Sequence, residues 1–131
     1  MKQFSKIFLI IFAAFLLFKG TGFAQEGVFR AVHLLNLKSV ENEAKLIAML
    51  EDFNKIVAKV GYPNIQYNLW KERGDREEGQ FKYIFESTWP DQATYDKVHN
   101  NEEYQTVFKK YKTQYEELIK EDVYSRYIPL N

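Results

Sequence analysis

The sequence predicts a single α+β domain, because two apolar periodicities alternate along one continuous stretch of chain. Segments in which every second residue is apolar are typical of strands, and apolar residues three or four apart are typical of helices. After an apolar leader, the two patterns follow one another in the order β-α-β-β-α-β. No internal repeat or low-complexity tract interrupts them, which favours one domain over several.

The first strand and the first helix are predicted between residues 28 and 61. Residues 28–37 (VFRAVHLLNL) are apolar on both faces, as in a central strand of a sheet. Ser39 and the two glutamates that follow it mark the start of a helix, since acidic side chains favour the positive end of the helix dipole. Apolar residues at helical spacing continue to Val60, and Gly61 ends the helix.

A hairpin, a second helical region and a last strand complete the pattern. Residues 65–70 and 81–86 alternate apolar and polar side chains, and a charged, glycine-containing segment joins them. A helix begins after Pro90-Asp91, is interrupted at Asn100-Asn101, and continues with an apolar stripe at helical spacing. Residues 123–128 form the last strand.

The compact solution for this order is a four-stranded antiparallel sheet with the helices on one face, the ferredoxin-like arrangement. The strands at 28–37 and 81–86 carry apolar residues on both faces, although the helices cover only one. The other face therefore needs a cover, and a second copy of the chain is the simplest one. We expect a homodimer in which two sheets pack face to face as a dimeric α/β barrel.

The first 24 residues have the layout of a secretory signal peptide. Two lysines precede an unbroken apolar run at 7–18, and small residues lead to Ala24. A membrane anchor is the alternative, but the run is shorter than the roughly 20 residues that a spanning helix needs. We expect cleavage after Ala24, a folded domain at 25–131, a secreted or periplasmic location, and no membrane attachment after cleavage.

Composition excludes several classes of site. The mature chain would hold 15 basic and 18 acidic residues, which argues against a nucleic-acid or anionic-membrane partner. The absence of cysteine excludes disulfides, thiolate metal sites and a thiol nucleophile. The sequence also lacks a phosphate-binding loop, a zinc-binding pair and a dinucleotide fingerprint. It therefore predicts neither a metal nor a cofactor.

The segment YIFESTWPDQATYDKVHNNEEYQTVF (83–108) resembles antibiotic-biosynthesis monooxygenase-like domains of the dimeric α/β-barrel superfamily. In that family a strand runs into a Trp, and a helix with a small residue, an aromatic and a His follows before a polar break. The matching positions here are Trp89, Ala93, Tyr95, His99, Asn100, Asn101 and Tyr104. The resemblance implies the dimeric barrel fold. The activities in that family range from cofactor-free oxygenation of polycyclic phenols to heme degradation.

The heme-degrading branch of this family is a poor match. Aligned from Trp89, the position of its iron-ligating His falls on or beside Phe108, and that of its helix Trp falls near Val98. Only Asn36 on the first strand has a plausible counterpart. Iron coordination of that kind is therefore not expected.

The two histidines are the candidate catalytic residues. His99 follows Tyr95 by four residues, so both lie on one helix face, and an imidazole suits a general base. We nevertheless expect His99 to point to solvent or to cap the break at Asn100. His33 alternates with apolar residues along its strand, so it is either a hydrogen-bonded interior residue or a pocket residue. It has the better chance of facing an enclosed space.

Aromatic residues provide candidate ligand contacts. Arg30 and Glu86 are expected to pair across two strands. A flat apolar ligand would contact some of the following residues, which could instead simply form the core: Asn36, Tyr67, Trp70, Tyr83, Trp89 and Tyr95.

Two classes of function fit these residues. The first is a dimeric barrel that binds a small apolar or aromatic ligand without catalysis. The second is a cofactor-independent monooxygenase or isomerase that acts on a small aromatic or polyketide-like molecule, with His33 or His99 as proton acceptor. An enclosed aromatic pocket containing either histidine would favour the enzyme, and a collapsed interior would favour the first class.

The leader generates a direct prediction. Expression of the whole chain in an exporting host should yield a mature protein that begins at Gln25, because the signal would be removed after Ala24. Intact-mass measurement of the exported protein checks this. A mass that retains residues 1–24 would contradict it.

Overall fold

The computed structural model describes residues 27–74 and 80–131. The predicted signal peptide lies outside the described residues. The elements along the chain are β1 (Phe29–Leu37), α2 (Asn42–Val60), β2 (Asn68–Lys71), β3 (Tyr83–Trp89), α3 (Gln92–His99), α4 (Glu102–Leu118) and β4 (Ile119–Tyr127). This order and the antiparallel sheet confirm the predicted ferredoxin-like fold.

The four strands lie in the order β2-β3-β1-β4, and every neighbouring pair is antiparallel. β1 is central, as its two apolar faces predicted. His33 pairs with Phe85 on one side and with Tyr124 on the other. Side chains of paired residues point to the same face of a sheet, so these three rings form one row across the inner face.

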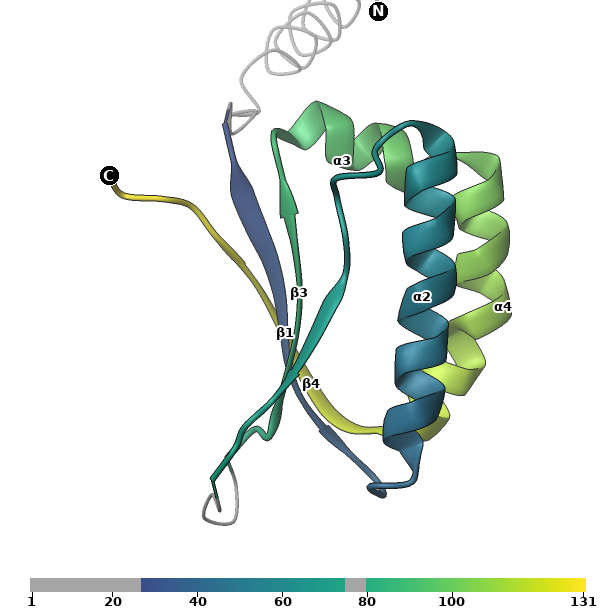
Figure 1. The fold of residues 1–131 in the computed structure, drawn as a ribbon, viewed down its shortest axis with the longest axis vertical. Coiled ribbons are helices and arrows are strands. Elements are labelled where there is room, and N and C mark those ends of the chain that lie inside the picture. The colour runs from purple at the N-terminus through teal and green to yellow at the C-terminus, as the bar shows by residue number, and fades with distance from the viewer. Residues whose placement is uncertain (1–26, 75–79) are drawn as a thin grey trace, which may run out of the picture.

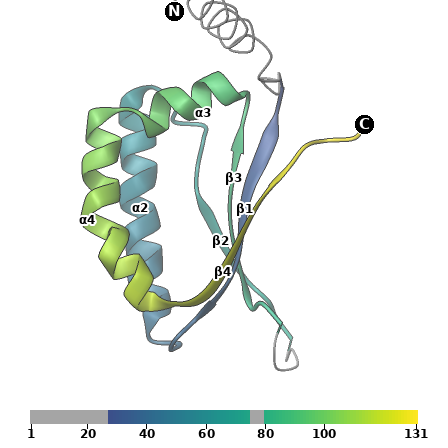
Figure 2. The same ribbon diagram turned by 180° about the vertical axis from the view of Figure 1, so that it is seen from behind.

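All the helices described here lie on one side of the sheet, with α2 and α4 side by side and α3 across one end (Figures 1 and 2). The break predicted at Asn100-Asn101 separates α3 from α4. It is a proper helix start, because the Asn101 side chain accepts hydrogen bonds from the backbone N–H groups of Glu103 and Tyr104. Gly61 ends α2 in the left-handed conformation, with φ of 116°.

Strand boundaries differ from the sequence-based expectation at β2 and β4. β2 covers only Asn68–Lys71, and β4 begins at Ile119 rather than at residue 123. The backbone turns straight from α4 into an extended conformation at Ile119, which is buried and pairs with Leu37. The early residues of β4 are mostly exposed and polar, so their pattern carries no apolar signal of a strand.

The core lies between the inner face of the sheet and the helices. Its fully buried side chains are Phe29, Leu35, Leu46, Val57, Trp89 and Val98. Trp89 ends β3 and donates its indole N–H to the hydroxyl of Ser87 at 2.8 Å. This bond satisfies the one polar atom of the largest core side chain, which fixes the entry into α3.

None of the helices within residues 27–74 and 80–131 lies over the outer face of the sheet (Figures 1 and 2). Glu86 lies on this face, where it pairs with Arg30 at 3.3 Å and accepts the indole N–H of Trp70 at 3.0 Å. The predicted pair of Arg30 with Glu86 is thus confirmed. Large apolar side chains on this face stay exposed, among them Trp70, Ile84, Val123 and Tyr127.

Candidate functional site: a two-histidine cavity

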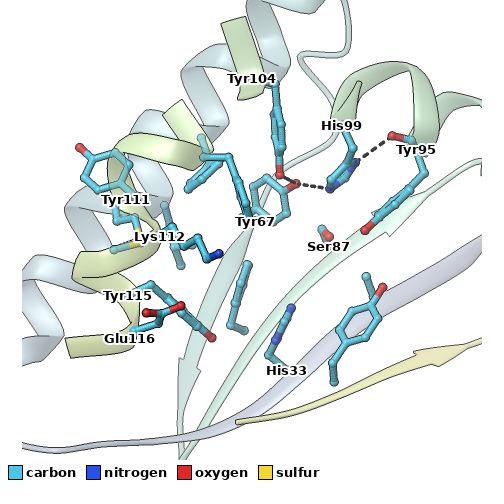
Figure 3. Close-up of a pocket in the computed structure, with 17 residues that line it drawn as sticks. His33, Tyr67, Ser87, Tyr95, His99, Tyr104, Tyr111, Lys112, Tyr115 and Glu116 are labelled. Carbon is cyan, nitrogen blue, oxygen red and sulfur yellow. Dashed lines mark hydrogen bonds between the residues drawn. The ribbon is translucent and has the colours of Figure 1, made fainter. Parts of the chain in front are cut away.

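A cavity of about 510 Å³ opens between the inner face of the sheet and the helices (Figure 3). Its aromatic lining comes from both layers and comprises Phe53, Tyr67, Phe85, Tyr95, Tyr104, Phe108, Tyr111, Tyr115 and Tyr124. Its polar side chains are few: His33, Ser87, His99, Lys112 and Glu116. An apolar cavity with a few polar groups is the usual form of a small-molecule site.

His99 is the last residue of α3, and its ring is held in one orientation. Its Nδ1 lies 2.8 Å from the backbone carbonyl oxygen of Tyr95, one helical turn earlier. The two rings stack with centroids 3.7 Å apart and an interplanar angle of 20°. A carbonyl oxygen can only accept a hydrogen bond, so Nδ1 carries the proton and Nε2 of the neutral ring is the acceptor.

Burial lowers the pKa of the His99 imidazole below its ordinary value, although the hydrogen bond to the Tyr95 carbonyl opposes this shift. His99 is therefore neutral at neutral pH. The expectation that it would face solvent or cap the helix break is wrong. Asn101 provides the cap, and the His99 ring instead packs between Tyr95, Trp89 and Tyr104.

A chain of phenols leads to the free nitrogen of His99. The hydroxyls of Tyr104 and Tyr67 lie 2.8 Å apart, and that of Tyr67 lies 3.4 Å from Nε2 of His99. Burial raises the pKa of Tyr67 well above its ordinary value and raises that of Tyr104 as well. Both phenols therefore stay protonated and can donate in sequence toward His99. Asn54 of α2 fixes Tyr67 through hydrogen bonds to its backbone N–H and carbonyl groups.

His33 is held in a similar way from the opposite wall of the cavity. Its Nδ1 lies 2.9 Å from both carboxylate oxygens of Asp122 on β4. Its ring stacks on Phe85 with centroids 4.8 Å apart and an interplanar angle of 8°. The hydroxyl of Tyr115 on α4 donates to Asp122 at 2.7 Å. Three elements thus position one imidazole.

The sequence-based site residues divide into three groups. Four line the cavity: His33, Tyr67, Tyr95 and His99. Tyr83 and Trp89 are buried on the inner face but belong to the core. Tyr83 donates to Glu43, and burial raises its pKa to about 12.

Asn36 and Trp70 lie on the outer face, away from the cavity. Asn36 closes the β2–β3 connection, since it accepts from the backbone N–H of Lys82 and donates to the carbonyl of Gln80. The structure therefore does not place these two residues at the ligand site.

Sequence reasoning missed Asp122 and Tyr115. Asp122 precedes the last strand predicted from the sequence (123–128), so the sequence does not predict the sheet face on which it lies. In the structure it pairs with Leu35 and points inward beside His33. The strand register supplies the only signal that could have identified it, and the register is not readable from one sequence.

The cavity is open on one side, where two exposed charged residues of α4 stand one turn apart. Lys112 extends its ammonium group toward the interior (Figure 3). Glu116 lies beside it on the same side. Within residues 27–74 and 80–131, no group of three His, Asp or Glu side chains is placed to hold a metal ion. In the same ranges, no helix is long and apolar enough to cross a membrane.

Comparison with known proteins supports the fold. No protein-family model and no curated protein matches the chain. Among solved structures, an antibiotic-biosynthesis monooxygenase-type protein from Bacteroides thetaiotaomicron is 16% identical, with a TM-score of 0.55, over 82% of this chain and 92% of that one. SnoaB, a cofactor-independent oxygenase from Streptomyces nogalater, is 11% identical, with a TM-score of 0.56, over 80% and 95%.

A dimeric ferredoxin-like protein of unknown function from Thermobifida fusca is 9% identical, with a TM-score of 0.55, over 83% of this chain and 97% of that one. These similarities confirm the predicted resemblance at the level of the fold. At such low identity they carry no residue-level correspondence.

The lowered pKa of His99 predicts a pH dependence of stability. The folded state binds fewer protons than the unfolded state in the window between the lowered pKa and the ordinary value of 6.5. Its stability should therefore fall as pH drops through this window and be fully regained above it. Urea unfolding at about pH 5.5 and pH 7.5 measures this. The variant His99→Gln should lose less stability at the lower pH than the wild type, and an equal loss in both proteins would contradict the account.

Proposed function

We propose that this chain binds a flat aromatic or polyketide-like molecule with an ionisable hydroxyl, and that His99 removes its proton. The protein would then act as a cofactor-independent monooxygenase or isomerase. One observation carries this proposal. His99 presents an unprotonated Nε2 to an aromatic cavity, with its tautomer set by the Tyr95 carbonyl.

The lining suits such a ligand in both shape and chemistry. A cavity of about 510 Å³ falls within the usual range for small-molecule sites. Aromatic side chains on opposite walls favour a flat conjugated body. An imidazole that is neutral at the pH at which the protein works is a suitable general base for a phenol or enol hydroxyl.

Removal of the proton is the step that both reactions share. The resulting conjugate base can be reprotonated at another atom, which is isomerisation, or it can react with molecular oxygen, which is monooxygenation. The similarity in fold to SnoaB, which is a cofactor-independent oxygenase, supports this class. The open interior with two histidines favours it over a binding protein without catalysis.

We also propose that the protein is a homodimer that packs the outer sheet faces together. Trp70, Ile84, Val123 and Tyr127 on this face are each between 41% and 58% exposed in the single chain. A contiguous apolar face of this kind is a common mark of a protein interface. A dimeric protein among the similar structures is consistent with the proposal.

The predicted signal peptide at 1–24 further supports a secreted or periplasmic location.

Binding should depend on His99. 2-Naphthol is a suitable probe because it is flat, apolar and carries one hydroxyl. Equilibrium dialysis should give one saturable site per chain, and His99→Gln should weaken binding about fivefold, the effect of one lost hydrogen bond of roughly 1 kcal/mol.

Trp70→Phe is the matched control, because Trp70 is an aromatic residue on the outer face, away from the cavity. This variant should bind the probe as tightly as the wild type does. No saturable binding by the wild type, or equal weakening in both variants, would contradict the proposed ligand site.

The dimer has its own test. Sedimentation at micromolar concentration should show a dimer, and Ile84→Lys should convert it to a monomer, because a buried unpaired ammonium is costly at an interface. Val40→Lys is the control, since Val40 is 69% exposed in the turn before α2. A wild-type monomer would remove the barrel from the account.

A further inference from the structure

The cavity contains a second imidazole, that of His33. It is not needed if His99 only removes one proton from the ligand. His33 and His99 point into the same space from β1 and α3 (Figure 3). In each ring Nδ1 lies within hydrogen-bond distance of an accepting oxygen. The far end of each ring, which carries Nε2, points into the cavity (Figure 3), where Nε2 of His99 lies 3.4 Å from the hydroxyl of Tyr67. Each ring also stacks on an aromatic neighbour. Two imidazoles therefore present the same reactive atom to one ligand.

The two rings differ in the charge of their partners. His99 is held by a neutral backbone carbonyl, and the guanidinium of Arg126 lies 4.5 Å from the ring of Tyr95, on which His99 stacks. A positive charge on His99 is thus poorly supported. His33 is held by the carboxylate of Asp122, which is a direct counter-ion for an imidazolium. His99 is therefore unprotonated before the reaction and has a nitrogen free to take a proton, whereas the contact with Asp122 lets His33 hold a proton that it can deliver.

We propose that the cavity is a two-histidine proton-transfer site that interconverts the enol and keto forms of a flat conjugated substrate. The inference rests on the proposed function and assigns it to the isomerase class. His99 Nε2 accepts the enol O–H proton as the carbon–oxygen double bond forms. The imidazolium of His33 gives its Nε2 proton to the carbon at the far end of the enol, where a new C–H bond forms.

This step is balanced without an oxidant or a reductant. The substrate loses one proton and gains one, and the protein ends with His99 protonated and His33 neutral. Both rings then exchange protons with water through the open side of the cavity, and the side chain of His33 is 26% exposed. Asp122 is a positioning residue, because it fixes which nitrogen of His33 faces the substrate.

Phenylenolpyruvate, the enol of phenylpyruvate, is a suitable probe. It is flat and conjugated, and its carboxylate suits Lys112 at the open side. Its ketonisation is followed by the loss of enol absorbance. The wild-type protein should accelerate ketonisation over buffer at the same pH. His33→Gln and His99→Gln should each lower the rate by at least about 100-fold, the usual contribution of a general acid or base, and Trp70→Phe should leave the rate unchanged.

The role of Asp122 is tested by a spectroscopic readout. In ¹⁵N-labelled wild-type protein, at a pH at which the His33 ring is neutral, the remaining proton should lie on Nδ1. In Asp122→Ala it should shift to the Nε2-protonated form, with a lower rate of ketonisation. A circular dichroism spectrum like that of the wild type ensures that the variant is folded. An unchanged His33 tautomer in this variant would overturn the assigned role of Asp122.

The outcomes separate this inference from the proposed function. If 2-naphthol binds and depends on His99, but the wild type does not accelerate ketonisation, the proton-transfer inference is wrong and the binding site stands. Acceleration that His33→Gln does not reduce also overturns the two-histidine mechanism. If 2-naphthol does not bind at all, the proposed function is wrong, and the inference that rests on it is wrong as well.

Discussion

The hydrogen bond from His99 Nδ1 to the carbonyl of Tyr95 determines what the cavity can do. Without it, the imidazole could rotate or carry its proton on either nitrogen. With it, one face of the ring stacks on Tyr95 and the free nitrogen points to the cavity and the hydroxyl of Tyr67. Because burial lowers the pKa of this histidine, the ring is also neutral where the protein is expected to work. Orientation and protonation are therefore set by the same local structure.

The rest of the fold holds that local structure in place. Trp89 ends β3 in the core and leads into α3, whose first turn is capped by the side chain of Asp91. On the other wall, β1 places His33 in a row between Phe85 and Tyr124. Large rings on α4 and α2 then keep the helices apart from the sheet, since an aromatic side chain cannot collapse as a flexible aliphatic one can. The result is a cavity beside the packed core.

Much of the fold could be predicted from one sequence, because it depends on local periodicity. The alternation around His33 placed it on an apolar face, and the glycine and asparagine signals placed the ends of α2 and α3. The site could be predicted only in part. Both faces of the sheet are rich in apolar residues, so the sequence could not tell that Tyr67 faces the cavity while Trp70 faces outward.

Asp122 and the orientation of His99 depended on tertiary structure. The position of Asp122 follows from the register of β4 against β1, which one sequence does not reveal. The four-residue spacing of Tyr95 and His99 correctly predicted a shared helix face. It did not say whether that face would point inward, because the burial of Trp89 and Val98 orients α3. Residues set by periodicity were thus predictable, and residues set by packing between elements were not.

The most direct test of the account is the tautomer of His99 in solution. ¹⁵N chemical shifts of the imidazole in labelled protein near neutral pH distinguish a protonated nitrogen from an unprotonated one. The account predicts a neutral ring with the proton on Nδ1 and a free Nε2 whose shift changes when 2-naphthol is added. A ring protonated on Nε2, or a charged imidazolium at neutral pH, would contradict the claim that this cavity contains a prepared general base.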